Sequence, residues 1–70
     1  MGAVVHITLN GEPYDLDGSP TVADLLTRLS IDARRVAVER NLVVVKRGAF
    51  ETTALAEGDE IEIVNFVGGG

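Results

Sequence analysis

A single helical stripe in a chain of 70 residues limits the folds that this sequence can adopt. The apolar residues of the stripe recur every three or four positions, the spacing of one helix face: Val22, Leu25, Leu26 and Leu29. Thr21 is placed to cap this helix, Asp24 can complete a capping box, and the helix is expected to end near Ser30. Because one helix covers one face of one sheet, the rest of the chain must supply that sheet, which is the α+β class.

Five other segments have the alternation or the apolar character of strands. These segments are residues 5–9, 14–17, 36–40, 42–45 and 60–67. Asn10-Gly11, between the first two, strongly predicts a two-residue hairpin. Residues 46–56 are expected to be irregular and anchored in the core by Phe50 and Leu55.

The order of these segments predicts a particular sheet. If the helix crosses over in the right-handed sense, the last strand can lie centrally beside the first strand. The sequence therefore predicts a β-grasp (ubiquitin-like) fold, with a mixed sheet of four to five strands covered by one helix. We expect residues 1–67 to form a single domain and residues 68–70 to form a flexible tail.

Composition excludes several classes of protein. The chain has no cysteine, so it has neither disulfides nor thiolate metal sites. No apolar run approaches the roughly 20 residues of a membrane span, and the N-terminus lacks the pattern of a signal peptide. The net charge of −5 argues against nucleic acid and anionic membranes as partners. We therefore expect a cytoplasmic protein.

The charges are unevenly placed along the chain. All six basic residues lie between Arg28 and Arg47, whereas residues 48–70 carry only acidic ones. The half of the chain that leads to the C-terminus is therefore acidic. A partner that receives this end is expected to present a basic rim.

Few residues offer catalytic chemistry. The single histidine, His6, lies at the polar parity of the first strand, where an exposed side chain is expected rather than a general base or a ligand. Asp15 and Asp17, like Glu60 and Glu62, share a strand face and could do acid–base work, but exposed acids are the commoner case. The sequence predicts no catalytic residue, no bound cofactor and no metal site.

The last predicted strand changes character near its end. Up to Ile63 its apolar residues share one parity and its acids the other, but at Val64 and Phe66 the outward parity becomes apolar. Either the helix or the loop around Phe50 covers these two side chains, or they form a docking surface. In the second case we expect Val64, Phe66 and the neighbouring Val67 to contact a partner protein.

Three glycines, Gly68, Gly69 and Gly70, follow this strand. Their only functional group is the α-carboxylate of Gly70, which is ionised at neutral pH. Adenylation would convert it to a mixed anhydride that a sulfur or nitrogen nucleophile can attack, and glycines leave that carbon unobstructed. The alternative is a frayed end without function.

Several motifs together resemble a known family. They are N-G near the start, T-V-A-D-L-L at the helix, V-A-V-E-R-N in the middle and G-D-E-I-E-I-V-N-F-V-G-G-G at the end. With them the whole chain resembles the sulfur carrier proteins of thiamin biosynthesis, the ThiS family. One departure is V-V-V-K-R, which lacks the proline that members often have before the arginine.

The resemblance implies a protein co-substrate rather than an enzyme. Gly70, the last residue of the Gly69-Gly70 pair, would be adenylated by an activating enzyme that uses ATP and Mg. A sulfur donor protein would supply the sulfur of a thiocarboxylate, and thiazole synthase would receive it. The alternatives are the small subunit of molybdopterin synthase, a ubiquitin-like protein modifier, and a β-grasp binding module with an idle tail.

Overall fold

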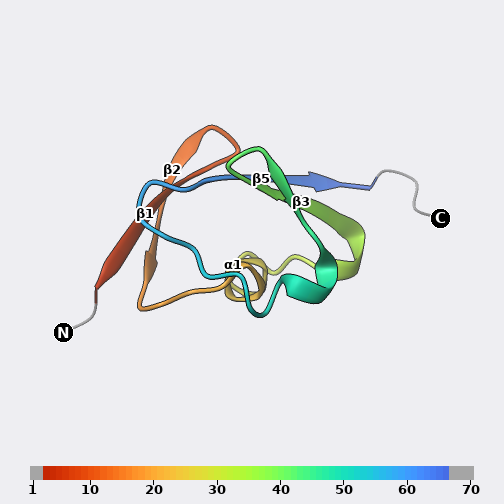
Figure 1. The fold of residues 1–70 in the computed structure, drawn as a ribbon, viewed down its shortest axis with the longest axis horizontal. Helices are drawn as coiled ribbons and strands as arrows, with labels where there is room; N and C mark the ends of the chain where they lie inside the picture. Colours follow the sequence, from red (N-terminus) through yellow and green to blue (C-terminus); the bar gives the residue numbers. More distant parts are fainter. Residues whose placement is uncertain (1–2, 67–70) are drawn as a thin grey trace.

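The computed structural model describes residues 3–66, and residues 1–2 and 67–70 lie outside this range. The elements of the described range follow one another in the order shown in Figure 1. They are β1 (Val4–Leu9), β2 (Glu12–Asp17), α1 (Val22–Arg28), the 3-10 helix η1 (Ala33–Arg35), β3 (Val36–Arg40), β4 (Val43–Val45), the 3-10 helix η2 (Arg47–Ala49) and β5 (Glu60–Asn65). The two 3-10 helices were not expected from the sequence.

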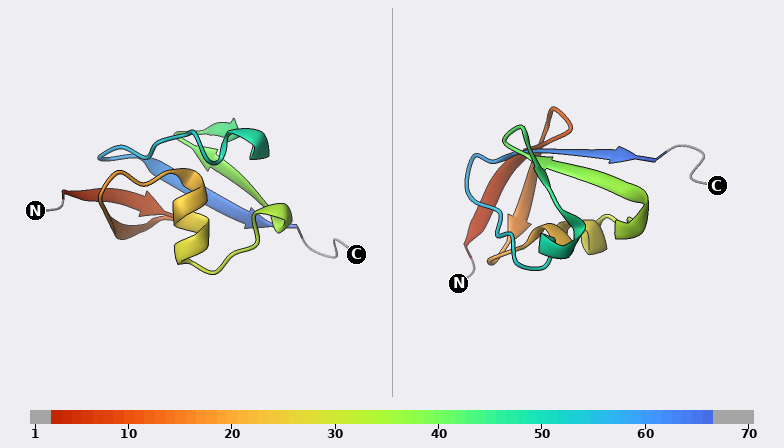
Figure 2. Two further views of the ribbon diagram at one scale, coloured as in Figure 1. Left: turned by 90° about the horizontal axis from the view of Figure 1, so that it is seen from below. Right: turned by 45° about the vertical axis from the view of Figure 1, so that its right-hand side comes forward.

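The strands form one mixed sheet in the order β2-β1-β5-β3-β4. β1 and β5 are parallel, and the other neighbouring pairs are antiparallel. Helix α1 lies across one face of this sheet, and the other face is open (Figures 1 and 2). The last strand is thus central and lies beside the first, which confirms the predicted β-grasp fold.

Helix α1 begins where the sequence places its cap. The Thr21 N–H donates to Asp24 Oδ2 at 2.8 Å, and the Asp24 N–H donates to Thr21 Oγ1 at 3.2 Å, so both halves of the capping box are present. At the other end Leu29 is the C-cap, and Ser30 takes a left-handed φ of 59° that ends the helix.

Two hairpins turn through two residues each with positive φ. Asn10 and Gly11 join β1 to β2 with φ values of 49° and 84°, as expected for Asn-Gly. β2 begins at Glu12, earlier than predicted, because an edge strand tolerates Pro13. In the second hairpin, the prediction that Leu42 begins β4 is wrong, because Asn41 and Leu42 form the turn.

The core lies between the helix and one face of the sheet. The buried apolar side chains are Ile7, Leu16, Val36, Val38 and Ile61 from the sheet, Val22, Leu25 and Leu26 from the helix, and Phe50 and Leu55 from the segment between β4 and β5. Each fully buried aliphatic side chain contributes about 1.5–3 kcal/mol. The predicted anchoring of the irregular segment by Phe50 and Leu55 is confirmed.

Candidate functional site

The outer side chains of β5 are acidic at its start and apolar at its end. Val64 is 58% exposed and Phe66, directly after the strand, is 56% exposed. The alternative that the helix or the loop around Phe50 covers them is therefore wrong. Their contact with a partner stays a prediction.

Two more residues extend this apolar surface. In the sheet register Ala37 of β3 lies directly opposite Val64, and Val44 of β4 lies opposite Glu39, two residues along β3. Paired residues share a face, so these side chains lie on the face that the helix does not cover. We call Ala37, Val44, Val64 and Phe66 the outer patch.

The contribution of β4 to the outer patch was not predicted from the sequence. The sequence nevertheless contains an indication of it. Leu42 to Val45 is a run of four apolar residues, and a short strand with one buried face cannot bury all four side chains. In the structure Leu42, Val43 and Val44 are all exposed. Such a run at a hairpin indicates surface that is available for contact.

Charges of both signs border the outer patch. Glu39 and Glu62 lie directly opposite one another in β3 and β5, an arrangement in which like charges repel. At the other end the Phe66 N–H donates to the Arg35 C=O at 2.9 Å, which brings η1 beside the end of β5. The surroundings of this end are therefore mixed in charge rather than purely acidic, because strand pairing brings the basic middle of the chain against the last strand.

The two arginines of η1 both form ion pairs with Asp32. Arg34 donates to both carboxylate oxygens of Asp32, at 3.2 and 3.1 Å, while Arg35 Nε lies 3.9 Å from the same carboxylate. The hydrogen bonds from the Arg34 side chain and backbone lower the pKa of Asp32 to about 2. Arg35 is the more weakly paired of the two cations and lies closer in sequence to β3.

A second polar cluster lies at the opposite end of β5. Asp59 is a carboxylate with only 5% exposure, and its Oδ2 accepts from Arg40 Nε at 2.7 Å and from the Ala56 N–H at 2.8 Å. Asn41 Nδ2 donates to the other oxygen at 3.0 Å. Burial opposes ionisation, but these bonds together hold the pKa of Asp59 below its usual value. The cluster is fully hydrogen-bonded, so its role is to hold the second hairpin against β5.

The other acids and the histidine considered as candidate catalytic residues are exposed, as predicted from the sequence. His6 is exposed, and its Nδ1 lies 3.0 Å from Glu57. The His6 N–H, which donates to the same carboxylate, lowers the pKa of Glu57. Asp15 and Asp17 are exposed as expected. Within residues 3–66 no three histidines, cysteines or acids lie together as a metal site would require.

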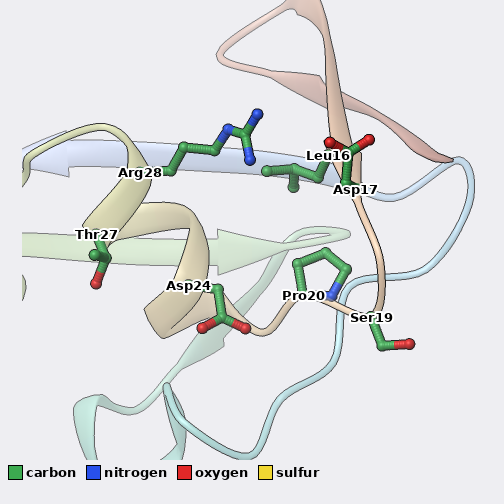
Figure 3. Close-up of a pocket in the computed structure, with 7 residues that line it drawn as sticks. All are labelled: Leu16, Asp17, Ser19, Pro20, Asp24, Thr27 and Arg28. Carbon is green, nitrogen blue, oxygen red and sulfur yellow. The ribbon is translucent and has the colours of Figure 1, made fainter. Parts of the chain in front are cut away.

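The surface hollows do not involve the outer patch. One, of about 270 Å³, lies between the end of β2 and α1 (Figure 3). Its lining residues are Leu16, Asp17, Ser19, Pro20, Asp24, Thr27 and Arg28. Asp24 already caps the helix, and no residue of β5 or of the outer patch lines the hollow. We assign it no function.

Four predicted site residues cannot be placed. Val67, Gly68, Gly69 and Gly70 lie outside the described residues. The predicted extension of the last strand to Val67 is not seen within the described range, where β5 ends at Asn65. No helix of residues 3–66 is long and apolar enough to cross a membrane.

The sheet order, the one α-helix of residues 3–66 and the apolar surface at the last strand define a ubiquitin-like β-grasp protein. Comparison with known families gives the particular group. The sequence profile of the ThiS family matches residues 7–70, and the chain belongs to this family.

Individual relatives agree with this family. The chain is 40% identical over 50 residues to the sulfur carrier protein ThiS of Bacillus subtilis, covering 71% of this chain and 76% of that protein. It is 45% identical over 66 residues to a thiazole synthase of Paramagnetospirillum magneticum, covering 94% of this chain but 20% of that protein. The chain thus spans about a fifth of the length of that relative. The crystal structure of ThiS from Geobacter metallireducens superposes with a TM-score of 0.81 at 40% identity, covering 94% of this chain and all of that one.

Proposed function

We propose that this protein is a sulfur carrier of thiamin biosynthesis that holds sulfur as a thiocarboxylate at Gly70. The observation that carries the proposal is the β-grasp body of a ThiS family member followed directly by Gly68, Gly69 and Gly70. The Bacillus relative, named a sulfur carrier protein, supports it. We also propose a cytoplasmic location, where the ATP that this chemistry needs is available.

The chemistry divides between the carrier and its partners. A carboxylate oxygen of Gly70 attacks the α-phosphate of ATP, pyrophosphate leaves, and an acyl adenylate results. The terminal sulfur of a persulfide on the donor protein then attacks the acyl carbon, AMP leaves, and an acyl disulfide results. Two equivalents of a thiol reduce its S–S bond and are oxidised to a disulfide, which leaves the thiocarboxylate on Gly70 and a thiol on the donor. The activating enzyme holds ATP and Mg, so the carrier contributes an accessible carboxylate and a docking surface rather than a catalytic residue.

Two partners besides the sulfur donor follow from this scheme. The receiver is a thiazole synthase, as supported by the thiazole synthases of Paramagnetospirillum magneticum and Magnetococcus marinus, each of which contains a segment similar to this chain. The activating enzyme is proposed to dock on the outer patch, with Val64 and Phe66 beside the tail. A basic group of the partner placed at Glu39 and Glu62 would relieve their mutual repulsion.

Mass spectrometry tests the chemical step. Incubated with the matching activating enzyme, Mg-ATP and a sulfur source, the protein is expected to gain one sulfur in place of one oxygen at Gly70. Gly70→Ala should slow the reaction by crowding the reacting carbon, whereas Asp15→Asn, on the exposed face of β2, should not. The control without ATP should remain a free acid.

The same spectrum separates the alternatives. An adduct to a lysine in place of the thiocarboxylate would establish a protein modifier, and no change with any activating enzyme would leave a binding module. Transfer of sulfur to a molybdopterin precursor rather than to thiazole synthase would establish the other carrier function. The intact mass of the protein from its native cell also shows whether the chain ends at Gly70, as the proposal requires.

Substitutions in the outer patch test the docking surface. Val64→Asp or Phe66→Asp should weaken binding of the activating enzyme roughly tenfold or more, since an apolar contact is lost and a charge desolvated. The melting temperature should change little, because both side chains are exposed. Val4→Asp is the matched control, an exposed valine on β1. Equal effects at Val4 and Val64 would contradict a specific patch, and binding should slow as salt rises.

A further inference from the structure

The two edge strands of the sheet differ in how they are protected against pairing with a further strand. β2 contains Pro13, which has no N–H, and the exposed acids Asp15 and Asp17. Proline and charged side chains are the usual protections of an edge strand. β4, at the other edge, is a run of three valines (Val43–Val45) and has neither. The edge of β4 is therefore suited to pair with another strand.

The backbone of Val44 points away from the sheet. The Asn41 N–H donates to the Glu60 C=O, on the β5 side of β3. Backbone groups alternate along a strand, so Arg40 points to β4 and pairs with Val43, and Val44 then directs its N–H and C=O outward. Among residues 3–66 no strand lies on that side of β4, so both groups are free to pair with another chain.

Two more backbone groups point the same way. A trans peptide places its N–H and C=O on opposite sides. The Val43 N–H points to β3, so the Leu42 C=O points outward, and by the same geometry at Val45 the Lys46 N–H points outward. Lys46 has φ of −67° and ψ of 146°, so its backbone continues the extended edge.

The side chains along this edge are exposed and apolar. Leu42 is 82% exposed, Val43 68% and Val44 63%. Val44 belongs to the outer patch, and Val43 lies on the other face of the sheet because side chains alternate along a strand. A strand paired here would therefore cover apolar surface on both faces and bond the free backbone groups.

We propose that two copies of this chain pair through β4, antiparallel about a two-fold axis at Val44. Val44 of each copy donates to the Val44 C=O of the other, and the Lys46 N–H donates to the Leu42 C=O across the axis. The two sheets become one, with both outer patches on the same face. Three exposed side chains from each copy bury less than the roughly 1,200–2,000 Å² of a stable complex, so the dimer is weak and reversible. The inference does not depend on the proposed function.

The placement of charges is compatible with a second copy at β4 and not at β2. Lys46 lies across from Leu42 of the other copy, so the two Lys46 residues are four positions apart, about 14 Å. The two Glu39 residues, each beside Val44, are three strand spacings apart, also about 14 Å. Both separations exceed the screening length of about 8 Å at physiological salt. Pairing of two β2 edges would instead bring Asp15 against Asp15.

Substitution of Lys46 separates the backbone contribution from that of the charge. Lys46→Pro removes the outward N–H, and the fold should tolerate it because φ is already −67°. Its dissociation constant, from sedimentation equilibrium between about 10 μM and about 1 mM, should be roughly tenfold or more above wild type, since half of the intermolecular backbone bonds are lost. Lys46→Gln, which also removes the charge but keeps the N–H, should stay within about threefold. Equal constants for the two variants, or a monomeric wild type at about 1 mM, would overturn the proposal.

A second pair of variants tests the position of the axis. Val44→Lys places two like charges directly opposite one another and should leave the protein monomeric. Val4→Lys, at an exposed valine of β1, should dimerise as wild type does. Melting temperatures of both should change little in dilute solution, because both side chains are exposed. Equal loss of dimer in both variants would contradict pairing at β4.

Amide exchange on the wild-type protein needs no variant. The Val44 N–H should exchange rapidly in dilute solution and become protected as the concentration rises. The Asp15 N–H, on the edge of β2, is the internal control and should exchange rapidly throughout. Exchange at Val44 that does not depend on concentration, or protection at Asp15 instead, would overturn the proposal. So would a wild type that stays monomeric while Lys46→Pro loses affinity for the activating enzyme, because the edge would then serve another protein.

Discussion

The two hairpins of the molecule share the same arrangement at the first turn residue but differ in the second turn residue. In each, an asparagine with positive φ occupies the first turn position and its side chain bonds to β5. Asn10 holds Ile63, and Asn41 Oδ1 accepts from the Glu60 N–H at 2.9 Å. The central strand is therefore held from both sides by side-chain amides. The second turn residue is Gly11 in the first hairpin and Leu42 in the second.

The second hairpin is strained where the first is not. Gly11 adopts its positive φ freely, but a left-handed conformation costs Leu42 about 1–2 kcal/mol. Leu42 is 82% exposed, so packing against residues 3–66 does little to compensate the strain. The buried Asp59, bonded to both Arg40 and Asn41, stabilises the backbone around it. The turn of the first hairpin is thus free of strain at its second residue, whereas the turn of the second hairpin is strained there and depends more on tertiary contacts.

Removal of Asp59 should have the largest effect on stability. Asp59→Ala leaves Arg40, Asn41 and the Ala56 N–H without their acceptor, and the free energy of unfolding should fall by about 2–4 kcal/mol. Urea denaturation followed by circular dichroism measures it. Glu57→Ala, which removes an exposed carboxylate from the same turn, is the control and should cost much less. Similar losses would show that the second hairpin does not depend on Asp59.

The two asparagines can be compared directly. Asn41→Ala and Asn10→Ala each place alanine at positive φ and release a backbone N–H of β5, so each should cost about 1–3 kcal/mol. The loss should be larger for Asn41, which also donates to Asp59. Amide exchange should increase at Glu60 in the first variant and at Ile63 in the second. A larger loss for Asn10→Ala would reverse the comparison.

Substitution of the second turn residue of each hairpin tests the backbone strain at Leu42. Leu42→Gly should raise the free energy of unfolding by about 0.5–1 kcal/mol, the relief of strain being partly offset by the greater freedom of glycine in the unfolded chain. Gly11→Leu should lower it by at least as much. Thermal melts of the two variants, with opposite signs of shift, are the measurement. A destabilised Leu42→Gly would mean that Leu42 has packing that its exposure does not show.

The comparison also shows what could be predicted from sequence. The helix with its capping box, the Asn10-Gly11 hairpin and the core positions of Phe50 and Leu55 follow from local patterns, and the structure confirms them. The strand after the second turn was predicted to begin at Leu42, one residue too early, because leucine does not signal positive φ. Tertiary bonds of Asn41 to Glu60 and to Asp59 stabilise that turn, and no local pattern indicates them.

The candidate site was predicted in part for the same reason. The change of parity along the last strand identified Val64 and Phe66, which are exposed. Ala37 and Val44 join them only through strand pairing, and Arg35 reaches the end of β5 only through its bond to Phe66. The bond between Asn10 and Ile63 joins residues 53 positions apart, so no local pattern could indicate it.

The smallest effect we predict is on pH dependence. The pKa of Asp59 is lowered from 3.8, so its ionised form stabilises the fold at higher pH, and that stability is lost as the pH falls below 3.8 toward the folded-state pKa. Asp32, with a pKa of about 2, adds a loss of the same sign. Asp59→Asn should therefore show a shallower decline of the urea midpoint in acid, while Asn10→Ala, which leaves Asp59 and its hydrogen-bond partners in place, should keep the wild-type slope. An unchanged slope in Asp59→Asn would show that this carboxylate is not more strongly bound in the folded state than in the unfolded chain, and that the second hairpin owes its stability to shape rather than charge.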